Sequence, residues 1–168
     1  MYMKMEEMFK NMNKLTIFID MDGVIANFDK AKENHPDFEK KGFRPDLTLD
    51  FSKFDIIPGA KEAVNELLEM GHDLFIATTP PWNHPDAWGQ KRHWVEKNFP
   101  ALKRKMFLTH RKDLLLGDIL IDDSKWRGQP EFTGQWFHFG KENFINFIVG
   151  KFYESQWCAK PIFQKFHF

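Results

Sequence analysis

Two aspartates, Asp20 and Asp22, stand one residue apart at the end of an apolar run, and Gly23 follows directly behind them. Residues 15–19 have the length and composition of a β-strand, and side-chain alternation places both carboxylates on one side of the chain where that strand ends. Converging carboxylates need a cation between them, and oxygen ligands of this kind suit Mg2+. The segment therefore predicts an enzyme site, although a turn or a helix cap is the purely structural alternative.

Other polar groups that could act with this pair follow later strand-like runs. They are Thr78 with Thr79 and Asp122 with Asp123, while Lys112 lies ten residues before Asp122. Each type has a task if the substrate is a phosphate ester, because carboxylates hold Mg2+, hydroxyl and N–H groups bind phosphoryl oxygens, and an ammonium group cancels remaining charge. One aspartate could then attack phosphorus and form an acyl phosphate that water hydrolyses.

The elements that must position these groups alternate between strands and helices. We expect strands at residues 15–19, 73–77, 105–108, 118–121 and 135–139, and helices at residues 24–33, 58–70, 85–98 and from about 141. Such alternation predicts an α/β fold with a doubly wound, Rossmann-like parallel sheet whose ligands bind beyond the carboxyl ends of the strands. Residues 29–57 contain Pro36 and Pro45 and lack sustained periodicity, so we predict an inserted cap there.

The size and charge of the chain narrow the classes of protein to consider. Its 168 residues fit one domain, residues 1–168, with the cap as an insertion and residues 1–13 as a flexible leader. The formal net charge is zero, which disfavours polymeric nucleic acid as a partner. Cys158 is the single cysteine, so no internal disulfide can form, and no apolar stretch is long enough to cross a membrane. We therefore expect a cytoplasmic protein.

The order of these motifs, DxDGV, then an apolar strand with Thr, then Lys, then DD, resembles the haloacid dehalogenase-like (HAD-like) phosphatases. A closer resemblance is to the cytosolic-type 5′(3′)-deoxyribonucleotidases. It is carried by the segments FIDMDGVIANF, IPGAKEAVNEL, FIATTP, QKRHWVEKNF, LTHRKDLLLGDILIDD and WRGQPEF, which run in order from about residue 15 to 138. The resemblance implies a HAD-like fold with a short helical cap inserted after the first strand.

The resemblance also implies catalytic and metal-binding roles. Asp20 would be the nucleophile and a Mg2+ ligand. Asp22 would be the general acid and base and would offer its backbone carbonyl to the metal. In the DD pair the second aspartate is the expected ligand, which is Asp123, with Asp122 as the alternative one residue away.

Substrate binding is implied for a second group of residues. Thr78 matches the phosphate-binding threonine, with Thr79 as the alternative, and Lys112 matches the lysine that grips the phosphate. Gly23 allows the backbone to approach the phosphate closely. Phe28 matches a phenylalanine that contacts substrate, although it could equally be a core residue.

The resemblance implies hydrolysis of deoxyribonucleoside monophosphates with Mg2+ through an aspartyl-phosphate intermediate. The cap is shorter than in vertebrate members, so Gly42 and Phe43 are only candidate contacts, and a sugar phosphate or another small phosphomonoester is an alternative substrate. A phospholigand-binding module without turnover is the alternative from another class. The tail after Gly150 is expected to pack on the domain or on another subunit, which would make a homodimer. Arg127 and Gly128 could shape the acidic loop, and we assign them no chemistry.

Overall fold

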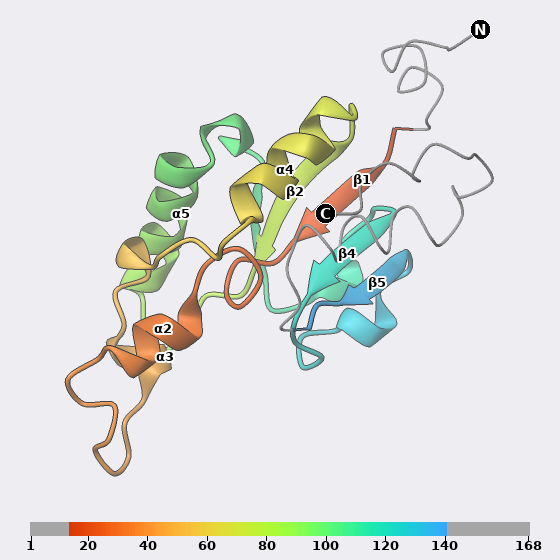
Figure 1. The fold of residues 1–168 in the computed structure, drawn as a ribbon. Coiled ribbons are helices and arrows are strands. Elements are labelled where there is room, and N and C mark those ends of the chain that lie inside the picture. Colours follow the sequence, from red (N-terminus) through yellow and green to blue (C-terminus); the bar gives the residue numbers. More distant parts are fainter. Residues whose placement is uncertain (1–13, 141–168) are drawn as a thin grey trace, which may run out of the picture.

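The computed structural model describes residues 14–140, which contain one sheet of five parallel strands (Figure 1). Along the sheet the order is β3-β2-β1-β4-β5, so the chain first builds to one side of β1 and then returns to add β4 and β5 on the other. This confirms the predicted doubly wound α/β fold. The strands are β1 (Thr16–Ile19), β2 (Asp73–Thr78), β3 (Met106–Leu108), β4 (Ile119–Asp122) and β5 (Gln135–His138).

Two helices cover one face of the sheet, α4 (Ala60–Glu69) and α5 (Asp86–Asn98) (Figure 1). The apolar spacing in α4 puts Ala63, Val64 and Leu67 on its buried side, where they join the main core cluster. Gly59 before this helix has a φ of 84°, a left-handed conformation that favours glycine. The helices predicted at residues 58–70 and 85–98 are therefore confirmed, with slightly shorter bounds.

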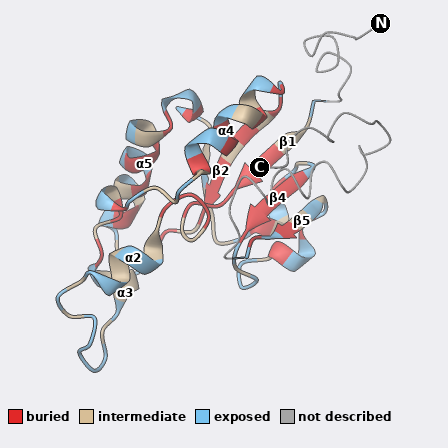
Figure 2. Ribbon diagram, viewed as in Figure 1, coloured by how far each residue is buried: buried red, intermediate tan, exposed pale blue. Residues whose placement is uncertain are grey.

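The three inner strands, β1, β2 and β4, are largely buried (Figure 2), whereas the edge strands β3 and β5 carry exposed residues. A smaller cluster lies on the face opposite α4 and α5, where Phe18, Ala77 and Leu120 pack with Leu115 and Phe132. Leu115 and Phe132 come from the segments on either side of β4. The helix predicted from about residue 141 lies outside the described residues.

The chain after β1 differs from the sequence-based prediction of a helix over residues 24–33. The helix α2 spans Phe28–Glu33, with Asn27 as its N-cap. Before it, the carbonyl oxygen of Met21 accepts hydrogen bonds from the backbone N–H groups of Val24, Ile25 and Ala26, at 3.4, 3.0 and 2.8 Å. These bonds form a tight turn, so the helix begins one turn later than predicted.

The segment between β1 and α4 contains α2, the short helix α3 (Pro45–Thr48) and the 3₁₀ turn η1 (Phe51–Lys53). Figure 1 shows α2 and α3 beyond the carboxyl ends of the strands. At the base of this segment, the backbone N–H of Asn27 donates to Asp55 O at 2.8 Å, and that of Ile57 donates to Ile25 O at 2.9 Å. These bonds bring the entry and the exit of the segment together. The cap bounds of 29–57 and the single domain of 1–168 stay predictions.

The remaining short elements are the 3₁₀ turns η2 (Pro100–Leu102), η3 (Lys112–Leu114) and η4 (Gln129–Glu131). Among the described residues, the helices all fall short of the length and apolar character that a bilayer crossing requires. The predictions for the leader of residues 1–13, for Cys158 and for the tail after Gly150 concern residues outside the described range. The homodimer stays a prediction.

Candidate active site

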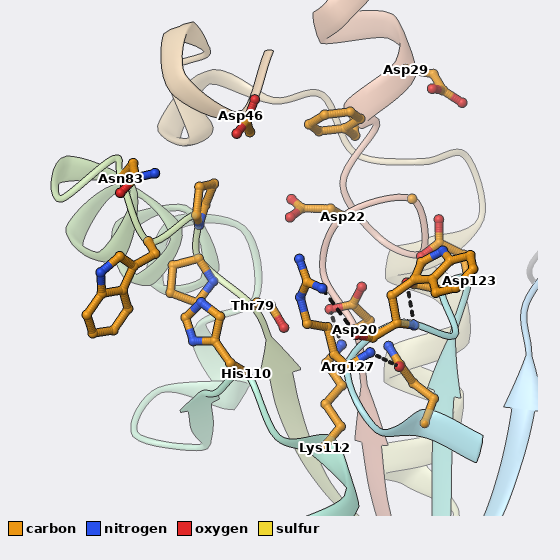
Figure 3. Close-up of a pocket in the computed structure, with 18 residues that line it drawn as sticks. Asp20, Asp22, Asp29, Asp46, Thr79, Asn83, His110, Lys112, Asp123 and Arg127 are labelled. Carbon is orange, nitrogen blue, oxygen red and sulfur yellow. Dashed lines mark hydrogen bonds and ion pairs between the residues drawn. The ribbon is translucent and has the colours of Figure 1, made fainter. Parts of the chain in front are cut away.

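The predicted polar groups converge where the strand order reverses, between the carboxyl ends of β1 and β4. Asp20 directly follows β1, and its backbone N–H donates to Ile121 O in β4 at 2.9 Å. Asp122 is the last residue of β4. A pocket of about 560 Å3 opens at this position, and Asp20, Asp22, Gly23, Lys112 and Asp123 are among the residues that line it (Figure 3). A crevice at the switch point of a parallel sheet is where α/β proteins bind ligands.

Lys112 is a buried ammonium group held between two carboxylates. Its side chain is 2% exposed, its Nζ lies 2.8 Å from Asp20 Oδ1, and it also forms an ion pair with Asp122. Burial alone would lower the pKa of Lys112, but Asp20 and Asp122 raise it, and the net shift is upward. Lys112 therefore stays charged and forms a fixed ion pair with Asp20.

Asp122 and Asp123 have different surroundings despite being adjacent. Asp122 is fully buried, with one oxygen paired to Lys112 and the other accepting the backbone N–H of Ser124 at 2.8 Å. Asp123 lies on the pocket wall, and its carboxylate rests against Gly23 so closely that a Cβ there would be 2.0 Å from Asp123 Oδ2. Only Asp123 thus presents its carboxylate to the pocket, which fits its predicted role better than the alternative, Asp122.

Three carboxylates form a group that could hold a metal ion. One oxygen each from Asp20, Asp122 and Asp123 lies within 4.8 Å of the others. Burial raises the pKa of Asp123 to about 7, helped by the charges of Asp20 and Asp122, and burial likewise raises the pKa of Asp122. The raised pKa values show that negative charge is unfavourable here, and a divalent cation would relieve the repulsion among the carboxylates. An oxygen-only set of this kind suits Mg2+.

Asp22 is paired with a lysine that the sequence analysis did not single out. Lys91 on α5 is fully buried, forms an ion pair with Asp22 Oδ2 and donates to Thr78 Oγ1 at 3.0 Å. Its Nζ also lies 4.7 Å from the centre of the Phe51 ring. Burial raises the pKa of Asp22 and outweighs the lowering effect of Lys91. Asp22 can therefore carry a proton beside Asp20.

A signal for Lys91 was present in the sequence. Ala87, Trp94 and Val95 form the buried side of α5, and Lys91 falls four residues after Ala87 and three before Trp94. A lysine on the apolar side of a helix needs a partner, because an unpaired charge is costly to bury. The neighbouring residues in the run QKRH are polar or charged, a composition typical of a solvated face.

The two threonines after β2 have different positions. Thr79 lines the pocket, and its hydroxyl donates to Thr109 O at 2.7 Å. Thr78 is fully buried beneath the pocket, where its hydroxyl accepts from Lys91. Each hydroxyl therefore has a protein partner, and the choice between Thr78 and Thr79 as phosphate ligand stays a prediction.

The candidate substrate contacts Phe28, Gly42 and Phe43 also differ in whether they line the pocket. Phe28 lines the pocket and packs edge-on against Phe54, with ring centres 6.0 Å apart. Gly42 and Phe43 are not among the pocket-lining residues, and the Phe43 ring stacks on His35 at 4.8 Å. Phe28 thus reaches both the pocket and the core, whereas Gly42 and Phe43 lie outside the pocket lining and their substrate contacts stay predictions.

Comparisons with known proteins agree with the geometry of the site. A family model described as 5′ nucleotidase, deoxy (pyrimidine), cytosolic type C protein matches residues 42–135. A Vibrio phage KVP40 protein assigned to the 5′(3′)-deoxyribonucleotidases is 31% identical over 145 residues, which cover 80% of this chain and 81% of that protein.

Two human proteins are similar over most of their length. The cytosolic-type 5′(3′)-deoxyribonucleotidase is 33% identical over 155 residues, covering 73% of this chain and 77% of that protein. The mitochondrial 5′(3′)-deoxyribonucleotidase is 31% identical over 156 residues, covering 74% of this chain and 68% of that protein. The resemblance stated from the motifs is therefore confirmed.

Proposed function

Since the chain belongs to the 5′(3′)-deoxyribonucleotidase family, we propose that it hydrolyses deoxyribonucleoside monophosphates with the help of Mg2+ and through a phosphorylated Asp20. The protein is a phosphoric monoester hydrolase of the 5′-nucleotidase type. The observation that carries the proposal is the Asp20 carboxylate, which lies on the pocket wall with Lys112 Nζ at 2.8 Å.

Asp20 is the nucleophile in this proposal. Its oxygen attacks phosphorus, the bond from phosphorus to the ester oxygen breaks, and the phosphoryl group is transferred to the carboxylate. Water then attacks phosphorus, which releases inorganic phosphate and regenerates Asp20. Lys112 supports the attack because its Nζ lies 2.8 Å from Asp20 Oδ1 and holds the carboxylate in place beside the phosphoryl group.

Asp22 moves the proton in both halves of the reaction. It donates a proton to the leaving ester oxygen and then takes one from the attacking water. Its raised pKa, due first to burial, keeps a proton available for the first half. Lys91 acts as a positioning residue because it fixes the Asp22 carboxylate from the side of α5.

The phosphoryl oxygens would be bound by Lys112, by the Thr78 or Thr79 hydroxyl and by the backbone at Gly23. Gly23 has a left-handed φ of 76°, and Asp123 leaves no room for a side chain there. Mg2+ would be held by the Asp20 and Asp123 carboxylates and by the backbone carbonyl of Asp22. When bound, Mg2+ supplies positive charge that offsets the phosphoryl oxygens. The clustered carboxylates and the raised pKa of Asp123 support a divalent ion at this place.

We propose a free nucleotide as the substrate rather than a polymer. A pocket of about 560 Å3 has room for a nucleoside monophosphate, and Phe28 offers an aromatic ring to its base or sugar. The zero net charge of the chain provides no general attraction to polymeric nucleic acid. We place the activity in the cytoplasm, as the name of the human cytosolic-type relative suggests.

The test is phosphate release from a panel of 5′- and 3′-nucleoside monophosphates and sugar phosphates, assayed with Mg2+ and with a chelator. We expect turnover of deoxyribonucleotides that stops when the metal is removed. Preference for a sugar phosphate would contradict the substrate class. Binding without phosphate release would contradict the enzymatic function itself.

A further inference from the structure

The lysines of the site are already neutralised by the protein's own carboxylates. Lys112 pairs with Asp20 and Asp122, and Lys91 pairs with Asp22. Lys112 therefore adds no net positive charge for an incoming phosphate group, and Lys91 adds one only while Asp22 carries a proton. The carboxylates of Asp20, Asp122 and Asp123 alone outnumber these two ammonium groups by one. Even with a bound divalent ion, a phosphomonoester dianion would therefore leave the pocket with excess negative charge.

Arg127 is a further cation at this pocket, and among residues 14–140 it pairs with no carboxylate. It lines the pocket, and Figure 3 shows its side chain reaching into the space on the side of Asp20 and Asp22. Within residues 14–140 no carboxylate lies within ion-pair distance of its guanidinium group, whose Nη1 donates only to the carbonyl oxygen of Trp126 at 3.1 Å. Its remaining N–H donors face the pocket or solvent.

The backbone of Arg127 is fixed although its side chain is exposed. The carbonyl oxygen of Arg127 accepts the backbone N–H of Lys112 at 2.7 Å. Its own N–H donates to Gln129 Oε1 at 2.7 Å, and Gln129 is fully buried. The loop that carries Arg127 is thus tied directly to the residue that grips Asp20.

Gly128 holds the same loop from the other side. Its φ of 86° is left-handed, and a Cβ there would lie 2.3 Å from Asp113 Oδ1. Asp113 is itself paired with Arg111. These contacts leave the loop little freedom, so the guanidinium group is presented to the pocket from a defined position.

We propose that Arg127 binds the non-bridging oxygens of the substrate phosphoryl group and of the phosphate product, together with Lys112. This inference rests on the proposed function, because it assumes that the pocket takes a phosphomonoester. A guanidinium group is suited to the task, since its planar donors match two phosphate oxygens at once. Arg127 would supply the positive charge that Lys112 and Lys91 cannot.

Binding of inorganic phosphate in the presence of Mg2+, measured by calorimetry, tests the role without requiring turnover. We expect Arg127→Gln to weaken phosphate binding by about tenfold to a hundredfold, the usual effect of losing charge-assisted hydrogen bonds. Arg127→Lys should recover part of the loss. The matched control is Lys125→Gln, because Lys125 is an exposed cation on the same loop that contacts the Trp126 ring and does not line the pocket.

Two further results separate a binding role from a structural one. Inhibition by an unphosphorylated deoxyribonucleoside should be the same in Arg127→Gln and in the wild-type protein, and kcat/KM for the nucleotide should fall with phosphate affinity. Unchanged phosphate binding in Arg127→Gln, or an equal loss in Lys125→Gln, would overturn the proposal. If the wild-type protein binds phosphate but hydrolyses no nucleotide, the proposed function fails, and phosphate binding still decides the role of Arg127.

Discussion

Replacing Lys91 by methionine removes the buried cation of Asp22 while keeping a side chain of similar length. Lys91 is fully buried, pairs with Asp22 and donates to Thr78 Oγ1 at 3.0 Å. Breaking a buried ion pair by removing one partner costs about 3–5 kcal/mol. The Asp22 side chain is 25% exposed, so water can replace part of the lost interaction, and we expect a loss of about 1–3 kcal/mol in the free energy of unfolding.

The effect on catalysis follows from the charge of Lys91. Without the ammonium group, the pKa of Asp22 should rise further, because only Lys91 and the more distant Lys112 lower it. The pH dependence of kcat should therefore move to higher pH. We expect kcat at neutral pH to fall by about tenfold to a hundredfold, which is part of the usual contribution of a general acid and base.

The assay is a pH profile of deoxyribonucleotide hydrolysis, run beside urea unfolding of the same samples. Lys97→Met is the matched control, since Lys97 is an exposed lysine on the same helix. An unchanged pH profile in Lys91→Met, with kcat equal to that of the control, would refute the positioning role. A loss of stability in Lys91→Met without a change in the pH profile would not support the positioning role.

Three other outcomes can be measured on single variants or on the wild-type protein. Gly23→Ala should weaken Mg2+ binding by about tenfold or more, because its Cβ would collide with Asp123, whereas Gly42→Ala has a similar left-handed φ but open space and should lose only about 1–2 kcal/mol of stability. Equal Mg2+ affinity in the two variants, measured by calorimetry, would argue against Asp123 as a ligand. The pKa of Asp123 is raised to about 7, so a proton competes with the metal at lower pH. Mg2+ affinity should therefore fall by about tenfold per pH unit below this value and level off above it. A flat pH profile of Mg2+ affinity would contradict Asp123 as a ligand. Burial lowers the pKa of His72, so the unfolded chain takes up a proton first as the pH falls and stability should decrease below about pH 6.5. His72→Asn retains an acceptor for the backbone N–H of Leu15 and should flatten that decrease in urea unfolding, and an identical pH dependence would show that His72 does not cause it.

The sequence predicted the sheet well because each strand is a short apolar run between clear turn signals. The strand ends also predicted where the acidic groups would meet, since Asp20, Asp22 and Asp123 follow strands and all line the pocket. Lys112, which also lines it, was found by its spacing to the acidic pair. The predicted start of the helix after β1 was wrong. Hydrogen bonds to Met21 O hold a turn there that no local propensity indicates.

Long-range pairing explains the other limits of the sequence analysis. Lys91 lies 69 residues from Asp22, and its burial depends on the packing of α5 against η1, which the apolar spacing of the helix only suggests. The difference between Asp122 and Asp123 depends on which carboxylate oxygens are already bonded to Lys112 and to the Ser124 N–H, and no sequence pattern indicates these bonds. Arg127 was assigned no chemistry because a basic residue in a polar loop has no pattern that reveals the pocket it faces.

The central claim is that Asp20 attacks phosphorus, and it is tested most directly by phosphate release from a deoxyribonucleoside monophosphate by Asp20→Asn with saturating Mg2+. The variant keeps the size of the side chain and removes its charge. We predict no phosphate release above the rate without enzyme, while thermal unfolding shows that the fold is intact. Hydrolysis by the purified, folded variant at a rate near that of the wild-type protein would contradict the account.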